Sequence, residues 1–120
     1  MMRTFLRAAI HNATVTHASA EWPVSIRIDP ILLRAAELQP LEQVEVINIG
    51  SGERFATYVD AAEEGSGDVR VHGGELHHVR SGDVISIVSW GFLHDGQTLA
   101  HRAKLITVDR QNHIVALLES

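Results

Sequence analysis

Short stretches of alternating or β-branched apolar residues follow one another along the chain at intervals of about ten residues. Turn signals built from Gly, Ser and Asp separate them, at 50–52, 65–67, 73–74, 81–83 and 95–96. Many short strands at this spacing favour a β-barrel or a β-sandwich. The predicted strands are 4–10, 14–17, 24–28, 43–49, 54–59, 68–72, 84–90, 104–108 and 113–118.

One helix is predicted after the third strand. Asp29 is a suitable N-cap, Pro30 fits the first helical position, and 31–38 is a run of strong helix formers. Pro40 is expected to end the helix. The helix is expected to pack on the barrel through one apolar face, formed by Ile31, Leu32, Ala35 and Leu38.

Composition limits the chemistry that the chain can carry. Its 120 residues fit a single domain, and no repeat or linker divides them. Ten Lys and Arg residues against fifteen Asp and Glu residues give a net charge of −5, which argues against a nucleic-acid partner. The absence of cysteine excludes disulfides, thiol nucleophiles and Cys-ligated metals. Lysine Schiff-base chemistry would depend on Lys104, the only lysine.

The chain shows no targeting or membrane signal. Its first residues include two arginines and no continuous apolar region, unlike a signal peptide. No stretch approaches the roughly 20 apolar residues that a membrane-spanning helix needs. We therefore expect a cytoplasmic protein without a membrane partner.

Three motifs are candidate functional sites. Residues 50–52 follow a strand as a phosphate-binding loop would, but the next stretch reads as another strand, so a hairpin turn is favoured. His72, His77 and His78 form a small cluster, but their spacing matches no known ligand pair on a helix. No metal site is predicted, and a His-based metal site there stays a weaker alternative. Ser25 lacks the surroundings of a nucleophile elbow, which leaves a hydrolase triad unsupported.

Several blocks of the sequence nevertheless keep a common register with Ser25, and together they resemble the bacterial aspartate 1-decarboxylases, pyruvoyl enzymes that make β-alanine for pantothenate biosynthesis. The most specific are Val15-Thr-His-Ala18 and Arg54-Phe-Ala-Thr-Tyr58. The match is poorer after Trp90. The residues and blocks that carry the resemblance are 2–11, 15–18, Ser25, 28–29, Asn48, 52–58, 61–66, Gly73, His77 and 82–84.

The resemblance implies a fold and a self-made cofactor. The expected fold is mainly β: a six-stranded double-psi β-barrel with short helices, a single domain over 1–120, assembled as a homotetramer with sites between subunits. The family cleaves its own chain, here between Val24 and Ser25, which would give products 1–24 and 25–120. Ser25 becomes a pyruvoyl group whose ketone forms a Schiff base with a small amino-acid substrate and accepts electrons as carbon dioxide leaves.

The resemblance also assigns roles to residues around Ser25. Thr57 supports self-processing by hydrogen bonding at the attacked carbonyl, and Tyr58 returns a proton to the decarboxylated carbon. Arg54 holds a substrate carboxylate. The remaining residues expected around the substrate are His11, Trp22, His72, Gly73 and Gly74.

The chain departs from the family pattern at several of these positions. Val24 stands where glycine normally precedes the processed serine, and Ala9 replaces a carboxylate-binding lysine. Further departures are Trp22 for tyrosine, Ile47 for an aromatic residue, and His72-Gly-Gly-Glu75 for an Asn-Gly-Ala-Ala loop. The lost cation predicts a substrate other than aspartate. Two questions stay open: whether processing needs a maturation factor, and whether the chain is instead a non-processing barrel homologue with a binding or assembly role.

Overall fold

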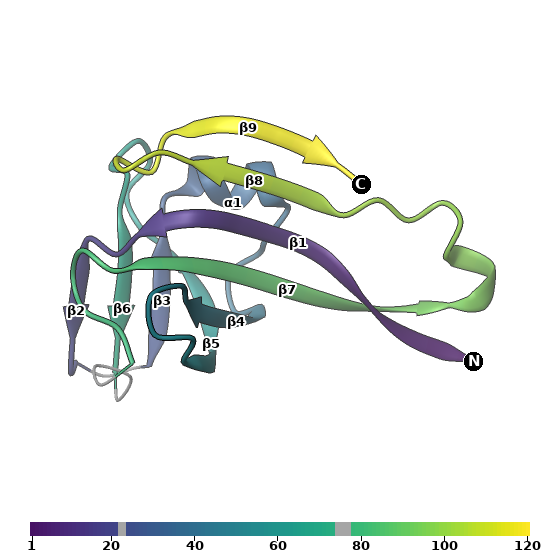
Figure 1. The fold of residues 1–120 in the computed structure, drawn as a ribbon, viewed down its shortest axis with the longest axis horizontal. Coiled ribbons are helices and arrows are strands. Elements are labelled where there is room, and N and C mark those ends of the chain that lie inside the picture. The colour runs from purple at the N-terminus through teal and green to yellow at the C-terminus, as the bar shows by residue number, and fades with distance from the viewer. Residues whose placement is uncertain (22–23, 74–77) are drawn as a thin grey trace.

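The computed structural model of the protein describes residues 1–21, 24–73 and 78–120. This described part contains nine strands, one α-helix and one short 3-10 helix (Figure 1). The prediction of a mainly β fold is confirmed. The strands are β1 (Met2–Thr14), β2 (His17–Ser19), β3 (Ser25–Ile28), β4 (Gln43–Asn48), β5 (Arg54–Ala61), β6 (Val69–His72), β7 (Val84–His94), β8 (Lys104–Val108) and β9 (Ile114–Glu119), and the helices are α1 (Pro30–Ala36) and η1 (Asp95–Gln97).

The strands pair in the order β2-β6-β3-β5-β4-β7-β1-β8-β9. Strand β1 runs on into β2 after Val15 and Thr16, and the Thr16 amide donates to the Val69 carbonyl of β6 at 2.9 Å. The sheet therefore closes on itself, as a barrel does. If β1 and β2 are taken as one interrupted strand, six strands surround the core, and β8 and β9 form a hairpin outside them. The described part of the structure has nine strands, as many as the pattern predicts, and the six-stranded barrel that the resemblance implies is consistent with this arrangement.

The barrel core is aliphatic. Its largest fully buried side chains come from β1, β3, α1, β7 and β8 and include Ile10, Ile26, Ile28, Leu32, Ile85, Ile87 and Ile106. Burying such side chains removes apolar surface from water, and this is the main force that holds a domain of this size together. With one Tyr, two Trp and three Phe residues in the chain, β-branched aliphatic residues supply the close packing between the strands.

Helix α1 begins as predicted and ends earlier. The Asp29 carboxylate caps it by accepting from the Ile31 amide at 2.9 Å, and Pro30 takes the first helical position. The prediction that Pro40 ends the helix is wrong, because Glu37 turns into the left-handed conformation (φ 56°) and closes the last turn. The buried face also differs from the predicted one: its buried residues are Leu32, Leu33 and Ala36, whereas Ile31 is exposed.

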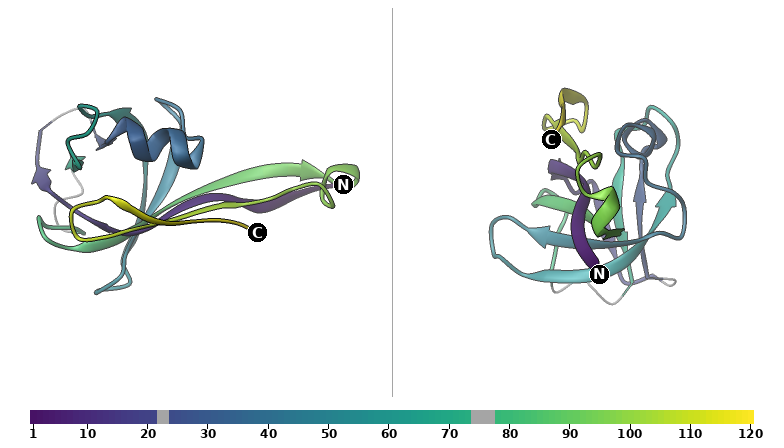
Figure 2. Two further views of the ribbon diagram at one scale, coloured as in Figure 1. Left: turned by 90° about the horizontal axis from the view of Figure 1, so that it is seen from above. Right: turned by 90° about the vertical axis from the view of Figure 1, so that its right-hand side faces the viewer.

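The start of β1 and the end of β7 leave the barrel as a long two-stranded arm (Figure 2). We call residues 2–6 and 90–94 the arm. The pairing runs from Met2 opposite His94 to Leu6 opposite Trp90, so β7 is longer than the predicted 84–90. The arm exposes large apolar side chains, among them those of Met2, Trp90 and Phe92. No helix in the described part of the chain is long and apolar enough to cross a membrane.

Candidate active site

Strand β3 begins at Ser25, the residue at which self-cleavage is predicted, and it lies between β6 and β5 (Figure 1). Strand β6 is antiparallel to it, with His72 opposite Ser25. Strand β5 is parallel to it, with Val59 opposite Ile26. The junction between Val24 and Ser25 is therefore enclosed by the end of β6 on one side and the middle of β5 on the other.

Strand register also sets which side chains share a face. Ile26 and Val59 are fully buried in the core, and side chains alternate along a strand, so Ser25, His72 and Tyr58 lie together on the opposite face. Ser25 is nevertheless only 3% exposed, which shows that other parts of the chain cover this face at the junction.

Thr57 stands on the core side of β5, level with Val24 when the register is followed two steps back from the pair of Ile26 and Val59. Its side chain is 7% exposed, and its Oγ1 has no hydrogen-bond partner among the described residues. Buried hydroxyls normally find partners. An unpaired donor at this position can stabilise negative charge that develops on a nearby carbonyl oxygen.

Gly73 follows β6 and packs directly against Val24. Its φ of +101° lies in a region that residues with a side chain rarely adopt, and its amide donates to the Ser19 carbonyl at 3.1 Å. A Cβ at this position would lie 2.6 Å from Val24 Cα and 2.4 Å from Val24 Cγ2. Glycine is therefore required here, and this close contact fixes the residue that precedes Ser25.

His72 is half-buried beside the junction. Its Nδ1 and the Ser19 Oγ are 3.0 Å apart, and its Nε2 is buried with no partner among the described residues. Burial lowers the pKa of the His72 imidazole, and the nearby Arg27 guanidinium lowers it further. The ring is therefore neutral over a wider pH range than an exposed histidine.

Arg54 at the start of β5 is already paired with a carboxylate. Its Nε and Nη2 donate to the two carboxylate oxygens of Glu45 on β4 at 3.3 and 2.7 Å, and the Trp90 indole donates to the same carboxylate at 3.4 Å. The hydrogen bond from Arg54 lowers the pKa of Glu45, more than burial raises it. The guanidinium thus has the fork geometry that a carboxylate needs, and Glu45 occupies it.

A surface cavity of about 450 Å³ lies beside Tyr58, lined by Leu41, Gln43, Ala56, Thr57 and Tyr58. A small amino acid fits such a volume. Ser25 is not among the lining residues, which belong to β5, the first residue of β4 and the segment just before it.

His11 lies elsewhere on the barrel. Its Nδ1 and the Ser86 Oγ are 2.8 Å apart, and it lines a cavity of about 320 Å³ with residues of β8 and β9. Strands β4 and β7 separate β1 from β5 in the sheet. Within one chain, the structure therefore does not bring His11 together with Tyr58.

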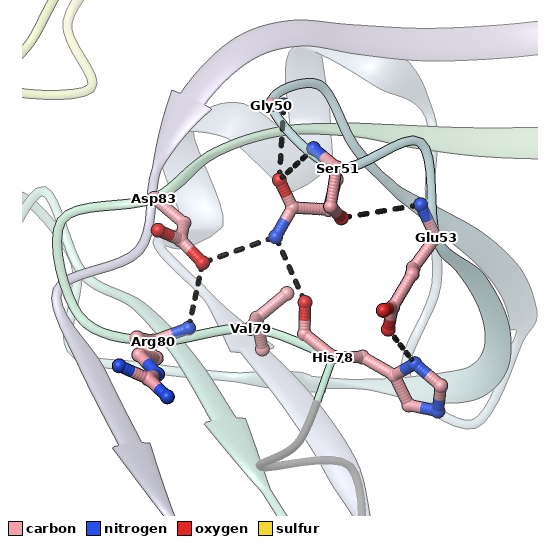
Figure 3. Close-up of a pocket in the computed structure, with 8 residues that line it drawn as sticks. Gly50, Ser51, Glu53, His78, Val79, Arg80 and Asp83 are labelled. Carbon is pink, nitrogen blue, oxygen red and sulfur yellow. Dashed lines mark hydrogen bonds and ion pairs between the residues drawn. The ribbon is translucent and has the colours of Figure 1, made fainter.

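A second polar cluster anchors the chain near residue 78 (Figure 3). The Asn48 amide nitrogen donates to the His78 carbonyl at 2.8 Å and to the Asp83 carboxylate at 3.0 Å. His78 Nδ1 lies 2.5 Å from a Glu53 carboxylate oxygen, and its ring stacks on Phe55. A cavity of about 320 Å³ opens between these residues. The cluster thus holds the chain in place from His78 onward, where the described residues resume after Gly73.

Known sequences match the chain along almost its whole length. The sequence profile of a family described as aspartate decarboxylase matches residues 1–115. Two relatives named aspartate 1-decarboxylase, from Listeria monocytogenes and Listeria innocua, are 38% and 37% identical over 118 residues, which is 98% of this chain and 93% of each relative. The chain belongs to the aspartate decarboxylase family.

The match to the aspartate decarboxylase family covers more of the chain than the blocks that carry the resemblance. The blocks end at residue 84 and the match was expected to weaken after Trp90, whereas the family profile extends to residue 115 and so includes β8 and most of the β8–β9 hairpin. Family membership also implies a pyruvoyl group. The surroundings of Ser25 fit one, since Thr57 offers an unpaired buried donor beside the residue from which the group would form.

The structure brings together some of the predicted site residues of this aspartate decarboxylase family member and not others. It places Ser25, Thr57, Tyr58, His72 and Gly73 on three adjacent strands or their ends. Arg54 begins the same strand as Tyr58, on the same face. His11 is on a separate part of the barrel, and Trp22 and Gly74 lie outside the described residues.

Sequence reasoning missed the acidic partner of Arg54 and the buried network at Asn48. No sequence motif marks Glu45 as the partner of Arg54, because their contact arises only when β4 pairs with β5. Asn48 did carry a signal: it continues the inward-facing series of Val44 and Val46, where a polar residue is unusual. For the histidine cluster, no group of three metal-ligating side chains gathers among the described residues, and His77 lies outside them.

Proposed function

We propose that the chain is a carboxy-lyase, a pyruvoyl-dependent α-decarboxylase of a small amino acid that processes itself between Val24 and Ser25. Its family supports the carboxy-lyase chemistry. The observation that carries the finer proposal is the arrangement of the junction, with the unpaired Thr57 hydroxyl level with it on β5 and Gly73 packed against Val24.

In the proposed processing, Ser25 Oγ attacks the Val24 carbonyl carbon, and the peptide bond becomes an ester. Negative charge then develops on the carbonyl oxygen, and Thr57 Oγ1 donates a hydrogen bond to it. Loss of the Ser25 Cα proton expels the Val24 carboxylate. Water then releases ammonia from the new terminus, so that the products are 1–24 and 25–120, the latter beginning with a pyruvoyl group.

Once formed, the pyruvoyl group supplies a ketone that takes up the substrate amine and accepts the electron pair left by departing carbon dioxide. Tyr58 is proposed to return a proton to the carbon that lost carbon dioxide, because it lies level with Ser25 on the same face. Arg54 is proposed to hold a substrate carboxylate through its planar guanidinium.

The remaining predicted site residues are proposed to enclose the substrate. His72 and Gly73 border Ser25 from β6. Trp22 and Gly74 lie outside the described residues and stay predicted substrate-binding residues. His11 is separated from Tyr58 within one chain by β4 and β7. We therefore propose that His11 reaches the site of a neighbouring subunit in a homotetramer.

The relatives' name makes aspartate the first substrate to test. Two features argue for a different amino acid. Ala9 supplies no positive charge, and Glu45 occupies the Arg54 guanidinium. A second carboxylate on the substrate would be repelled by Glu45, so a neutral or longer amino acid is favoured.

Denaturing mass spectrometry of the purified protein tests the processing. We expect two chains, 1–24 and 25–120, with the larger one lacking ammonia relative to a serine terminus. Ser25→Ala is expected to stay intact, folded and inactive. A wild-type chain that stays intact after prolonged warming would contradict self-processing, and it would support the alternative of a non-processing barrel homologue with a binding or assembly role.

A panel of amino acids assayed for carbon dioxide release then identifies the substrate. We expect a neutral or longer amino acid to give a higher kcat/KM than aspartate. Aspartate as the best substrate would contradict the argument from Ala9 and Glu45, while leaving the decarboxylase proposal intact.

The proposal extends to the protein's surroundings. We propose a single domain over 1–120, located in the cytoplasm, with no nucleic-acid or membrane partner. Comparing cleavage of the purified chain with cleavage of the same chain in cell extract tests the need for a maturation factor. Equal rates would show that none is needed, and cleavage in extract alone would show that one is.

A further inference from the structure

Two buried polar atoms near the junction have no hydrogen-bond partner among the described residues: Thr57 Oγ1 and His72 Nε2. The proposed processing uses the Thr57 hydroxyl and leaves the His72 nitrogen without a role. Because burying a polar atom without a partner is destabilising, a chemical task for this nitrogen would explain why a histidine stands here.

The pairing of β6 with β3 places His72 beside Ser25, the residue that attacks in the proposed processing. His72 is directly opposite Ser25 in the antiparallel pair of β6 and β3, and directly opposite residues carry their side chains on the same face with Cβ atoms about 5 Å apart. The next residue, Gly73, packs against Val24. The end of β6 therefore lies against both residues that the attacked peptide bond joins.

We propose that His72 is the proton carrier of self-processing, taking the proton from Ser25 Oγ as it attacks and delivering it to the Ser25 nitrogen as the amide breaks. This inference rests on the proposed function, because it concerns cleavage at the same junction. It adds a catalytic residue to a step for which the proposed function names an oxyanion donor and no base.

The protonation of His72 suits this role. Among the groups that face it, Arg27 on β3, Arg70 on β6 and His17 on β2 add to the lowering of its pKa by burial, and Glu21 opposes them. The imidazole is therefore neutral at neutral pH and available as a base. The role requires the tautomer in which Nδ1 carries the proton and donates it to the Ser19 Oγ, because Nε2 then keeps its lone pair.

The step balances without any further reactant. The bond from Ser25 Oγ to the Val24 carbonyl carbon forms and the bond from that carbon to the Ser25 nitrogen breaks. His72 Nε2 accepts the Oγ proton when the tetrahedral intermediate forms, and it returns the proton to the leaving nitrogen when the intermediate collapses to the ester. The imidazole ends as it began.

The rate of cleavage of the full chain, followed by mass spectrometry across pH 5 to 8, tests the proposal. For wild type, we expect the rate to rise with pH through the pKa of His72, which lies below the ordinary value of 6.5, and then to level off. His72→Gln keeps a polar side chain that does not titrate. It is expected to slow cleavage by about 100-fold at neutral pH and to remove that rise.

Controls separate this role from a structural one. His113→Asn removes an exposed histidine after β8 and is expected to leave both rate and profile unchanged. His72→Ala, checked by circular dichroism, guards against an effect particular to glutamine. His72 variants that cleave at the wild-type rate, or more slowly with an unchanged pH profile, would overturn the role of His72 alone. A wild-type chain that does not cleave would overturn the proposed function itself.

Discussion

Among single residues, Thr57 is one whose replacement should affect the stability of the fold and the rate of self-cleavage in different ways. Its buried Oγ1 has no partner among the described residues, so replacing it by a methyl group removes a desolvated polar atom. We expect Thr57→Val to leave the free energy of unfolding unchanged or to raise it by about 1 kcal/mol. Cleavage between Val24 and Ser25 is expected to slow by about 100-fold or more, since the oxyanion donor is gone.

Urea denaturation and mass spectrometry measure the two effects on the same sample. Thr16→Val is the matched contrast, because the Thr16 hydroxyl contacts both the amide and the carbonyl of Val69, and its loss should destabilise the fold. A Thr57→Val chain that cleaves at the wild-type rate would exclude Thr57 from the processing chemistry.

A second prediction for a single residue concerns Glu45. Its side chain holds Arg54 by two hydrogen bonds and would compete with a substrate carboxylate. Glu45→Gln weakens that competition, and we expect the KM for aspartate to fall about two- to fivefold, the range of a surface ion pair. Glu64→Gln, which breaks a similar surface pair with Arg34, is the control. An unchanged KM in Glu45→Gln would mean that Arg54 does not bind the substrate carboxylate.

Among the helices and strands, features set by neighbouring residues could be predicted from the sequence, whereas the residues at which α1 and β7 end could not. The start of α1 was predictable, because the Asp29 cap and Pro30 act within one turn. The end of α1 was not, because the left-handed Glu37 carries no residue-type signal, unlike a glycine. The length of β7 was missed for a related reason: its last residues pair with β1, 84 to 92 positions away in the sequence, rather than with a neighbouring segment.

Gly73 shows how one element end controls the junction. We expect Gly73→Ala to lower the free energy of unfolding by about 3 kcal/mol, because a methyl group would collide with Val24 and the backbone has a φ of +101°. Gly52→Ala is the matched control. Its φ is +77° with nothing within 4 Å of the added methyl, so it should lose about 1 kcal/mol from backbone strain alone.

Thermal and urea unfolding of the two variants separate collision from strain. Equal losses for Gly73→Ala and Gly52→Ala would show that the contact with Val24 is not tight in solution. We also expect Gly73→Ala to reduce cleavage and Gly52→Ala to leave it unchanged, since Gly73 alone of the two touches the junction.

At the scale of the whole molecule, the site depends on pairings that a periodic pattern does not reveal. Strand β3 lies between β6 and β5, so Ser25, His72 and Tyr58 lie level with one another on adjacent strands although more than thirty residues separate Ser25 from Tyr58 in the sequence. Hydrophobic alternation predicts that strands exist and leaves their order undetermined. The resemblance supplied the candidate residues, and the register of the sheet supplied their arrangement, including the contact of Glu45 with Arg54.

The separation of His11 from Tyr58 within one chain leads to the last prediction, which concerns assembly. If the site is completed by a neighbouring subunit, apolar surface must be covered, and the arm exposes Trp90 and Phe92. We expect light scattering to give four times the mass of the 13.2-kDa chain, and Phe92→Glu to lower that mass.

Ile31→Glu, which places the same charge on the exposed side of α1, serves as the control and should leave the mass unchanged. If Phe92→Glu yields smaller species that still cleave at Ser25 but lose decarboxylase activity, the junction acts within one chain and the substrate site needs two. A wild-type protein that is monomeric and active would contradict a site shared between subunits, because His11 would then act from β1 of the same chain or not at all.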